Sequence, residues 1–213
     1  MLDADRISTF LQPFAPDVAP ELVAQLQTYL DLLLRWNARV NLTAVRDPEQ
    51  IVTRHFGESL FAGRVLRDAG ALTGSPTLSD IGSGAGFPGI PIKLFAPEVR
   101  LTLIESQSKK ATFLRELVRA LQLTNAEVVC GRAETWGGTA HVVSLRAVEK
   151  FESILPTAAS LVAPEGYLAL LISEAQEPAA RASLGSEWES IRSEAIPASA
   201  GRVVWLARRR IHP

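Results

Sequence analysis

The chain has 213 residues, of which 47% are hydrophobic, and it carries a formal net charge of −1. This length suits one domain, or one domain with an appendage, and the apolar content excludes a chain that is disordered throughout. The isoelectric point of about 6.3 excludes a generally polybasic protein but not a local basic site, because phosphate contacts depend on local charge.

The first part of the chain predicts helices. Residues 20–36 carry apolar side chains at helical spacing, and Pro20 suits the first turn of a helix. A second helix is expected to begin with Asp47 as its N-cap, a proline in its first turn and a capping-box partner, and to continue through His55.

A run of small and turn-forming residues, 68–76, indicates a boundary. We expect a helical N-terminal region over residues 1–70 and a ligand-binding domain over residues 71–213.

After this boundary, apolar β-type runs alternate with helical patterns, of which 107–121 is the clearest. The alternation predicts an α/β fold with a mostly parallel sheet and helices on both faces. A turn-rich segment joins the last two runs and indicates an antiparallel C-terminal strand. The predicted strands cover residues 77–81, 100–104, 126–130, 141–145, 167–172, 187–195 and 203–209.

The segment after the first predicted strand contains Asp80 followed by Gly82, Gly84 and Gly86. A chain that turns sharply from a strand into a helix needs residues that tolerate positive φ and lack a Cβ atom. The dinucleotide fingerprint would require glycine at position 87, where this chain has Phe87, so an NAD(P)-dependent oxidoreductase is disfavoured. The spacing G-x-G-x-G after an acid is instead typical of S-adenosylmethionine (SAM) binding, to which we assign these five residues.

Other candidate residues follow the neighbouring strands, because ligands of open α/β sheets bind beyond the carboxyl ends of the strands. Glu105 ends the second strand about twenty residues after the glycines, the separation expected for an acid that binds ribose hydroxyls. It indicates a nucleoside ligand without choosing between NAD and SAM. Beyond the third strand, Ala133 and Glu134 are expected to contact adenine. Cys130 is expected to be a small buried hydrophobic residue rather than a nucleophile.

The fourth strand ends in Ser144-Leu145-Arg146 and is not followed by the N/D-P-P-Y/F segment of enzymes that methylate exocyclic amines. The prolyl-cysteine nucleophile of cytosine-C5 enzymes is also missing. An acceptor with its own free lone pair, such as guanine N7, needs neither, and its placement is then most of the catalysis. The pattern is consistent with N7 methylation, and methylation of a small molecule or a protein stays open.

Cysteine and histidine are too sparse for a disulfide or a metal site. There is one cysteine, and the three histidines lie far apart. We therefore expect no internal disulfide and no metal cofactor. The N-terminus lacks a basic-then-apolar signal, and the longest apolar runs are too short to cross a bilayer. The expectation is a soluble cytoplasmic protein with no membrane partner; the oligomeric state is open, with a monomer expected.

Several segments resemble the RsmG (GidB) family, in order along the chain. They are RWN at 35–37, VNLTAVRDP at 40–48, RH at 54–55, DIGSGAGFPGIP at 80–91 and SLRA at 144–147. The resemblance implies a class I methyltransferase fold with a helical N-terminal extension. It also implies SAM-dependent methylation of N7 of one guanine, guanine 527 in the family, in a hairpin loop of 16S ribosomal RNA. The implied partner is that RNA or the small-subunit particle.

The resemblance also assigns roles by position. Gly82 and Phe87 match loop contacts to SAM, the pair 133–134 matches the adenine segment, and Arg146 matches an arginine that faces both methyl donor and RNA. The other polar matches, which resemble the family's active-site and RNA-facing residues, are Asn41, His55, Lys109 and Arg132.

Plainer interpretations of three of these residues stay open. Asn41 could brace a turn, His55 could be a satisfied core histidine, and Lys109 could be an exposed helix residue. A non-catalytic protein that binds RNA or senses SAM with the same pocket is a further alternative.

The chain departs from the family after the fifth strand. A lysine–glycine pair is usual there, and this chain has Leu171-Ile172-Ser173. The missing cation could be supplied by the C-terminal residues 208–210, although a solvated run of arginines is the plainer interpretation.

Overall fold

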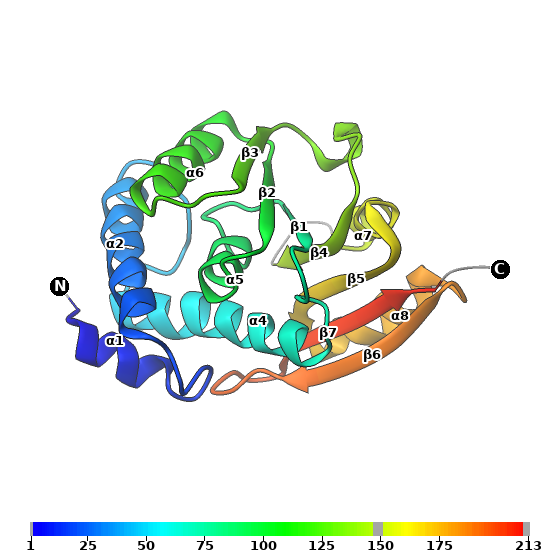
Figure 1. The fold of residues 1–213 in the computed structure, drawn as a ribbon, viewed down its shortest axis with the longest axis horizontal. Coiled ribbons are helices and arrows are strands. Elements are labelled where there is room, and N and C mark those ends of the chain that lie inside the picture. Colours follow the sequence, from blue (N-terminus) through cyan, green and yellow to red (C-terminus); the bar gives the residue numbers. More distant parts are fainter. Residues whose placement is uncertain (1, 147–150, 211–213) are drawn as a thin grey trace.

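The computed structural model describes residues 2–146 and 151–210 (Figure 1). At its centre is a seven-stranded sheet in the order β3-β2-β1-β4-β5-β7-β6. Every neighbouring pair from β3 to β5 is parallel, and β7 is antiparallel to both of its neighbours, which confirms the predicted α/β fold. The strands are β1 (Thr77–Ile81), β2 (Arg100–Glu105), β3 (Ala126–Cys130), β4 (Ala140–Arg146), β5 (Val162–Ser173), β6 (Trp188–Ala195) and β7 (Arg202–Arg209).

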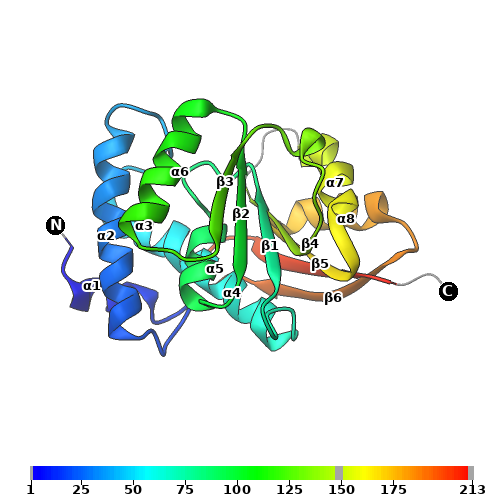
Figure 2. The ribbon, with the colours of Figure 1, turned by 45° about the horizontal axis from the view of Figure 1, so that its top comes forward.

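Helices cover both faces of this sheet. Figure 2 shows α2 and α6 on one side and α7 and α8 on the other. The α-helices are α1 (Ala4–Leu11), α2 (Pro20–Asn37), α3 (Pro48–Ile51), α4 (Glu58–Asp68), α5 (Gly89–Phe95), α6 (Ser108–Ala120), α7 (Phe151–Ser160) and α8 (Glu177–Leu184). Shorter turns are the π-helix η1 (Val52–Gly57) and the 3-10 helices η2 (Ala133–Thr135) and η3 (Glu174–Gln176).

Alternation along the strands divides the core into two clusters. In β5, Ala169 and Leu171 belong to the cluster under helices α1 to α6, and Leu168, Leu170 and Ile172 belong to the cluster under α7 and α8. This is the side-chain period of two expected for a strand buried on both faces. The first cluster contains residues of the N-terminal helices together with residues of β1 and β2, so those helices pack directly on the sheet. The division near residue 70 stays a prediction.

Strand β5 begins at Val162, five residues earlier than the sequence predicts. Its first part contains Pro164 and Gly166, which are typical of a turn. Glu165 between them has φ of 60°, and the register with β4 shifts at this point. The turn-like composition therefore marks an irregularity within β5, and the pairing of β5 with β4 continues on both sides of it.

The second predicted helix does begin at Asp47, whose side chain accepts a hydrogen bond from Gln50 N–H at 2.9 Å. It continues without a break through α3, η1 and α4. The unpredicted feature is the π-helical geometry of η1, which contains Arg54 and His55. Such turns are frequent at functional sites because they redirect side chains within a helix.

Candidate active site

A cavity of about 490 Å³ lies at the carboxyl ends of β1, β2 and β4. This is the edge where parallel α/β sheets bind ligands, and β1 and β4 are the pair at which the strand order reverses. Segments distant in sequence meet there. The lining residues are Asn41, Leu42, Thr43, Ala44, Arg54, His55, Gly82, Ser83, Gly84, Ala85, Phe87, Glu105, Lys110, Arg146 and Arg202.

The glycine loop after β1 has the backbone geometry that its sequence predicts. Gly82, Gly84 and Gly86 have φ of 65°, 54° and 97°, in the left-handed region. A Cβ atom on Gly84 would have only Gly82 O within 4 Å, at 3.7 Å, so the protein itself leaves this side of the loop open. A Cβ atom on Gly86 would lie 2.5 Å from the Tyr29 hydroxyl oxygen. Gly84 therefore has open space beside it, and Gly86 is required for packing.

Glu105 holds this loop from the end of β2. Its side chain is buried, Oε2 accepts a hydrogen bond from Gly84 N–H at 2.9 Å, and Oε1 accepts one from Gln107 N–H at 2.7 Å. A carboxylate has about four acceptor positions, so two remain for the hydroxyls of a ribose. The carboxylate is therefore fixed by backbone donors and is not a solvated residue at a strand end.

Replacing Glu105 by glutamine is expected to weaken SAM binding by about 1–3 kcal/mol, roughly 5- to 150-fold in Kd. The amide would present N–H groups where the loop and the ribose both require acceptors. Isothermal titration calorimetry measures the effect, with Glu127→Gln as control, because Glu127 is an exposed acid on β3 that only accepts from Thr102. An unchanged Kd in Glu105→Gln would remove the ribose assignment.

Helix α2 fixes the far side of the glycine loop. The buried Tyr29 hydroxyl donates to Ala85 O at 2.5 Å, and its ring stacks on Phe87 with a centroid distance of 5.3 Å and an interplanar angle of 8°. Phe56 and His55 pack on the same phenyl ring. The N-terminal helices thus support the loop directly. From the sequence, Tyr29 was only one of the apolar positions of a predicted helix, and its contact with the loop could not be seen.

Asp80 supports the site without lining it. It is fully buried, Oδ1 accepts from the Ser144 hydroxyl at 2.7 Å, and Oδ2 accepts from Gly89 N–H at 3.3 Å. Burial raises the pKa of Asp80 to about 6. Parallel pairing sets Asp80 beside Ser144, so the acid connects β1, β4 and the start of α5. This geometry gives Asp80 a supporting position rather than the direct cofactor contact expected from sequence.

Arg146, the last residue of β4, is held by a buried acid that sequence reasoning missed. Glu58 on α4 accepts from Arg146 Nη2 at 2.9 Å and from Arg202 Nη1 at 3.1 Å, and its side chain is 2% exposed. Arg146 Nη2 also donates to the Arg54 carbonyl. The Nε of Arg146 is buried and has no hydrogen-bond partner in the described part of the chain. Nη2 is thus fixed by protein and Nε is enclosed, whereas Nη1 forms no hydrogen bond with a described residue.

His55 has both ring nitrogens occupied. Nδ1 lies 3.1 Å from Arg146 Nη2, and Nε2 lies 2.8 Å from Thr43 Oγ1. Because a guanidinium can only donate, Nδ1 must accept, and the ring proton is on Nε2. Burial, with the nearby Arg146 charge, lowers the pKa of His55 to about 3. His55 is therefore a neutral residue that positions its neighbours, and its lone pair is not available to a substrate proton.

We expect the His55 ring to remain neutral in the folded protein between pH 5 and pH 8. Its folded pKa lies below the ordinary 6.5, so its contribution to stability is present above pH 6.5 and is lost as pH falls toward 3. Following the Cε1–H chemical shift by NMR tests this. A titration with a midpoint between pH 6 and pH 7 would contradict the hydrogen-bond arrangement.

The loop after α2 is fixed by Asn37 rather than by Asn41. Asn37 Oδ1 accepts from Leu42 N–H at 2.9 Å and Thr43 N–H at 3.0 Å, and its Nδ2 donates to Thr43 O at 3.0 Å. Asn41 is exposed and lines the cavity, as the resemblance implies. Thr43 Oγ1 accepts from His55 and from Val45 N–H, so its own proton is available to a ligand.

The structure brings some predicted residues together and leaves others outside the cavity. Lys109 is exposed, and the next residue of α6, Lys110, lines the cavity instead. Consecutive helical residues point about 100° apart, so a shift of one position changes which lysine faces the site. Arg132 is exposed and pairs with Glu134 at 3.6 Å.

The proposed adenine segment lies next to the proposed ribose acid. Cys130 pairs with Glu105 in the sheet register, and Gly131 N–H donates to Glu105 O at 3.0 Å, so Ala133 and Glu134 follow directly beyond that edge. The prediction that Cys130 is buried was wrong: its side chain is exposed, because β3 is the edge strand of the sheet.

The cation near the end of β5 comes from β7. Arg202 is the register partner of Ser173, where the family usually has its lysine–glycine pair, and it lines the cavity. The arginines at 208–210 cannot supply it, because β7 runs antiparallel and carries them to the opposite edge. There they pair with Glu165, Glu187 and Glu189.

Within the described ranges, no group of three or more histidine, cysteine or acidic side chains could hold a metal ion. No helix there is long and apolar enough to span a membrane.

The strand order, the glycine loop and the acid at the end of β2 define the fold of class I SAM-dependent methyltransferases. A ribosomal protein L11 methylase from Lactobacillus delbrueckii subsp. bulgaricus has this fold, with a TM-score of 0.60 at 13% identity over 75% of this chain and 80% of its own. M. jannaschii TYW2 in complex with AdoMet also has it, with a TM-score of 0.51 at 16% identity over 70% and 77%.

Sequence comparison identifies the family within this class. Residues 22–199 match the family described as GidB, rRNA small subunit methyltransferase G. A ribosomal RNA small subunit methyltransferase G of Xanthomonas euvesicatoria pv. vesicatoria (strain 85-10) is 40% identical over 169 residues, which cover 72% of this chain and 76% of the relative. The chain belongs to the rRNA small subunit methyltransferase G family, as its resemblance to RsmG predicts.

Proposed function

We propose that this chain transfers the methyl group of SAM to N7 of a single guanine in 16S ribosomal RNA, the family's guanine 527. The observation that carries the proposal is the makeup of the cavity. One side is the glycine loop with Glu105, and the other is formed by Asn41, Thr43, His55 and Arg146. A methyl donor and a base could meet between them.

The residues fit SAM in three respects. Gly84 leaves open backbone beside the loop, Glu105 has acceptor positions for ribose, and the segment that follows β3 adjoins Glu105. The fold neighbour with bound AdoMet supports the same cofactor. When bound, SAM supplies an electrophilic methyl group on a sulfonium.

The lining favours an acceptor that loses no proton. Of the lining residues with a carboxylate or an imidazole, Glu105 is held by two backbone N–H groups, and the His55 lone pair accepts from Arg146. A guanine N7 lone pair needs no base, because methylation leaves a cationic 7-methylguanine and S-adenosylhomocysteine. The protein then has to orient the base and exclude water.

Two donors are placed to orient it. The Arg146 Nη1 group and the Thr43 hydroxyl proton can each donate to guanine O6 or a nearby oxygen. An arginine that binds an oxygen beside N7 fixes the base without placing its charge on the nitrogen that becomes cationic.

The experiment is methyl transfer from labelled SAM to unmethylated 16S RNA, offered both as free RNA and as the small-subunit particle. The proposal expects 7-methylguanine at one position, mapped by cleavage at that base. Label in protein or in a small molecule, with none in RNA, would instead support the alternative methyltransferase. SAM binding without transfer to any of these would support a sensing role.

A further inference from the structure

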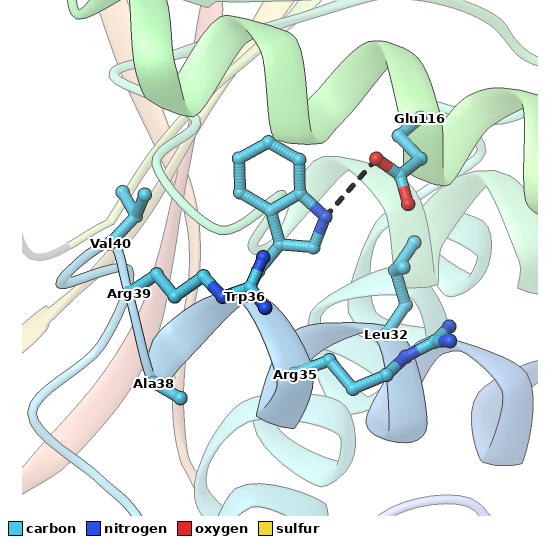
Figure 3. A pocket seen from close by; sticks show the side chains of 7 residues that line it. All are labelled: Leu32, Arg35, Trp36, Ala38, Arg39, Val40 and Glu116. Atoms are coloured by element: carbon cyan, nitrogen blue, oxygen red, sulfur yellow. Dashed lines mark hydrogen bonds between the residues drawn. The ribbon is translucent and has the colours of Figure 1, made fainter.

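A second cavity, of about 500 Å³, lies between the C-terminal end of α2 and the middle of α6 (Figure 3). It lies outside the proposed site of methyl transfer, and it contains most of the RWN segment, whose arginine and tryptophan the proposed mechanism does not use. The lining residues are Leu32, Arg35, Trp36, Ala38, Arg39, Val40 and Glu116.

An aromatic ring is fixed in this cavity. The Trp36 indole is half-buried, packs edge-on against Phe113 with a centroid distance of 5.7 Å, and donates Nε1–H to Glu116 Oε2 at 3.2 Å. Figure 3 shows the ring extending from α2 toward α6. The second oxygen of Glu116 accepts no hydrogen bond from a described residue. The cavity therefore offers an ordered π-surface beside a carboxylate with spare acceptor positions.

Two cations flank this ring. Arg35 and Arg39 are exposed, and neither forms an ion pair with any residue that the structure describes. By contrast, Arg181 of α8 is held by Glu177 at 3.0 Å, one turn away on the same helix. Unpaired guanidinium groups that line the same cavity as an aromatic ring are suited to phosphate oxygens.

The two cavities are neighbours along two elements. Residues 38–40 line the second cavity and residues 41–44 line the first, in one loop that Asn37 braces. On α6, Lys110 lines the first cavity and Glu116 the second, an axial separation of about 9 Å. A strand of nucleic acid that enters the first cavity can therefore continue into the second.

We propose that the second cavity binds an unpaired nucleotide of the RNA substrate, next in the strand to the methylated base. Its base lies against Trp36 and offers amino or imino N–H groups to Glu116, and its phosphates contact Arg35 and Arg39. Proteins recognise single-stranded RNA by such stacking and edge contacts. This inference rests on the proposed function, because it takes the substrate of the first cavity to be RNA.

The test measures RNA affinity by fluorescence anisotropy, with a hairpin whose loop contains the target guanine. Arg35→Gln with Arg39→Gln is expected to weaken binding at least fivefold at 0.1 M salt and to lower the slope of log K against log salt by about one per lost phosphate contact. Arg119→Gln is the matched control, since Arg119 is an exposed arginine of α6 that lines neither cavity. Affinity losses equal to the control would overturn the proposal.

Trp36 is tested separately, because Trp36→Leu also removes packing between α2 and α6. The expected result is at least a fivefold loss of RNA affinity with unchanged SAM affinity. In the wild-type protein, the indole N–H signal of Trp36, assigned from Trp36→Phe, should shift when a trinucleotide of the loop sequence is added. An unmoved signal at saturating trinucleotide would overturn the stacking arrangement.

The outcomes separate this proposal from the function on which it rests. If the wild-type protein methylates RNA and the arginine variants bind RNA normally, nucleotide binding by the second cavity is refuted and the proposed methylation stands. If these variants lose RNA binding but the wild-type protein forms no 7-methylguanine, the nucleotide site stands and the proposed reaction is refuted.

Discussion

Arg146→Lys is expected to lower the single-turnover rate of methyl transfer by about 10²-fold or more at saturating SAM and RNA, with SAM affinity changed by less than about fivefold. The reason is geometric. Arg146 Nη2 contacts Glu58, His55 and the Arg54 carbonyl, which leaves Nη1 for the substrate. A single ammonium cannot satisfy both sets of partners.

The lysine variant is chosen because an alanine variant could lose activity either through catalysis or through a loss of folding stability. Removing the Arg146 charge leaves the buried Glu58 with Arg202 alone, and breaking a buried pair costs about 3–5 kcal/mol. Lysine keeps a charge near Glu58. Arg181→Lys is a matched control, because Arg181 pairs with Glu177 on the exposed side of α8. A wild-type rate in Arg146→Lys would remove Arg146 from the reaction and leave Arg202, which also lines the cavity, as the better candidate.

Gly84→Val is expected to abolish SAM binding while most of the fold remains. The valine side chain would extend from the loop into the space assigned to SAM, since apart from the two adjacent residues only Gly82 O lies within 4 Å of the new Cβ. The substitution also strains the backbone, because φ at this position is 54°. That strain costs about 1–3 kcal/mol and must be separated from the loss of the ligand site.

Gly74→Val provides that separation. Gly74 has φ of 73°, no atom lies within 4 Å of the position that a Cβ atom would take, and the residue lies in the loop before β1, away from the cavity. Both variants should lower the melting temperature by similar amounts, and only Gly84→Val should lose the calorimetric signal of SAM. Normal SAM binding by Gly84→Val would mean that the cofactor binds elsewhere.

The strands and the position of the cavity at their carboxyl ends could be predicted because they depend on local patterns. All seven strands agree with the predicted runs to within one or two residues at most ends, the early start of β5 being the exception. Glycines with positive φ and an acid at the end of β2 follow from backbone sterics and strand spacing. Each of these features is determined by a few residues that are neighbours in the sequence.

Other features depend on contacts between distant segments. Helical periodicity placed Tyr29 in a core face, but not its hydrogen bond to Ala85, 56 positions later. Glu58 stands among apolar residues of α4, a signal that a charge is buried, yet its partners Arg146 and Arg202 lie 88 and 144 positions away.

The sequence by itself determined the order of strands and helices, the glycine loop, the acid at the end of β2 and the family. Those properties are encoded in residue types at short spacing, which fix local backbone geometry whatever packs around them. The tertiary structure alone decided that burial lowers the pKa of His55, that Lys110 rather than Lys109 lines the cavity, and that Arg202 lies beside the end of β5. Burial, charge pairing and side-chain direction are set by which surfaces meet, and the chain folds those surfaces together from segments far apart.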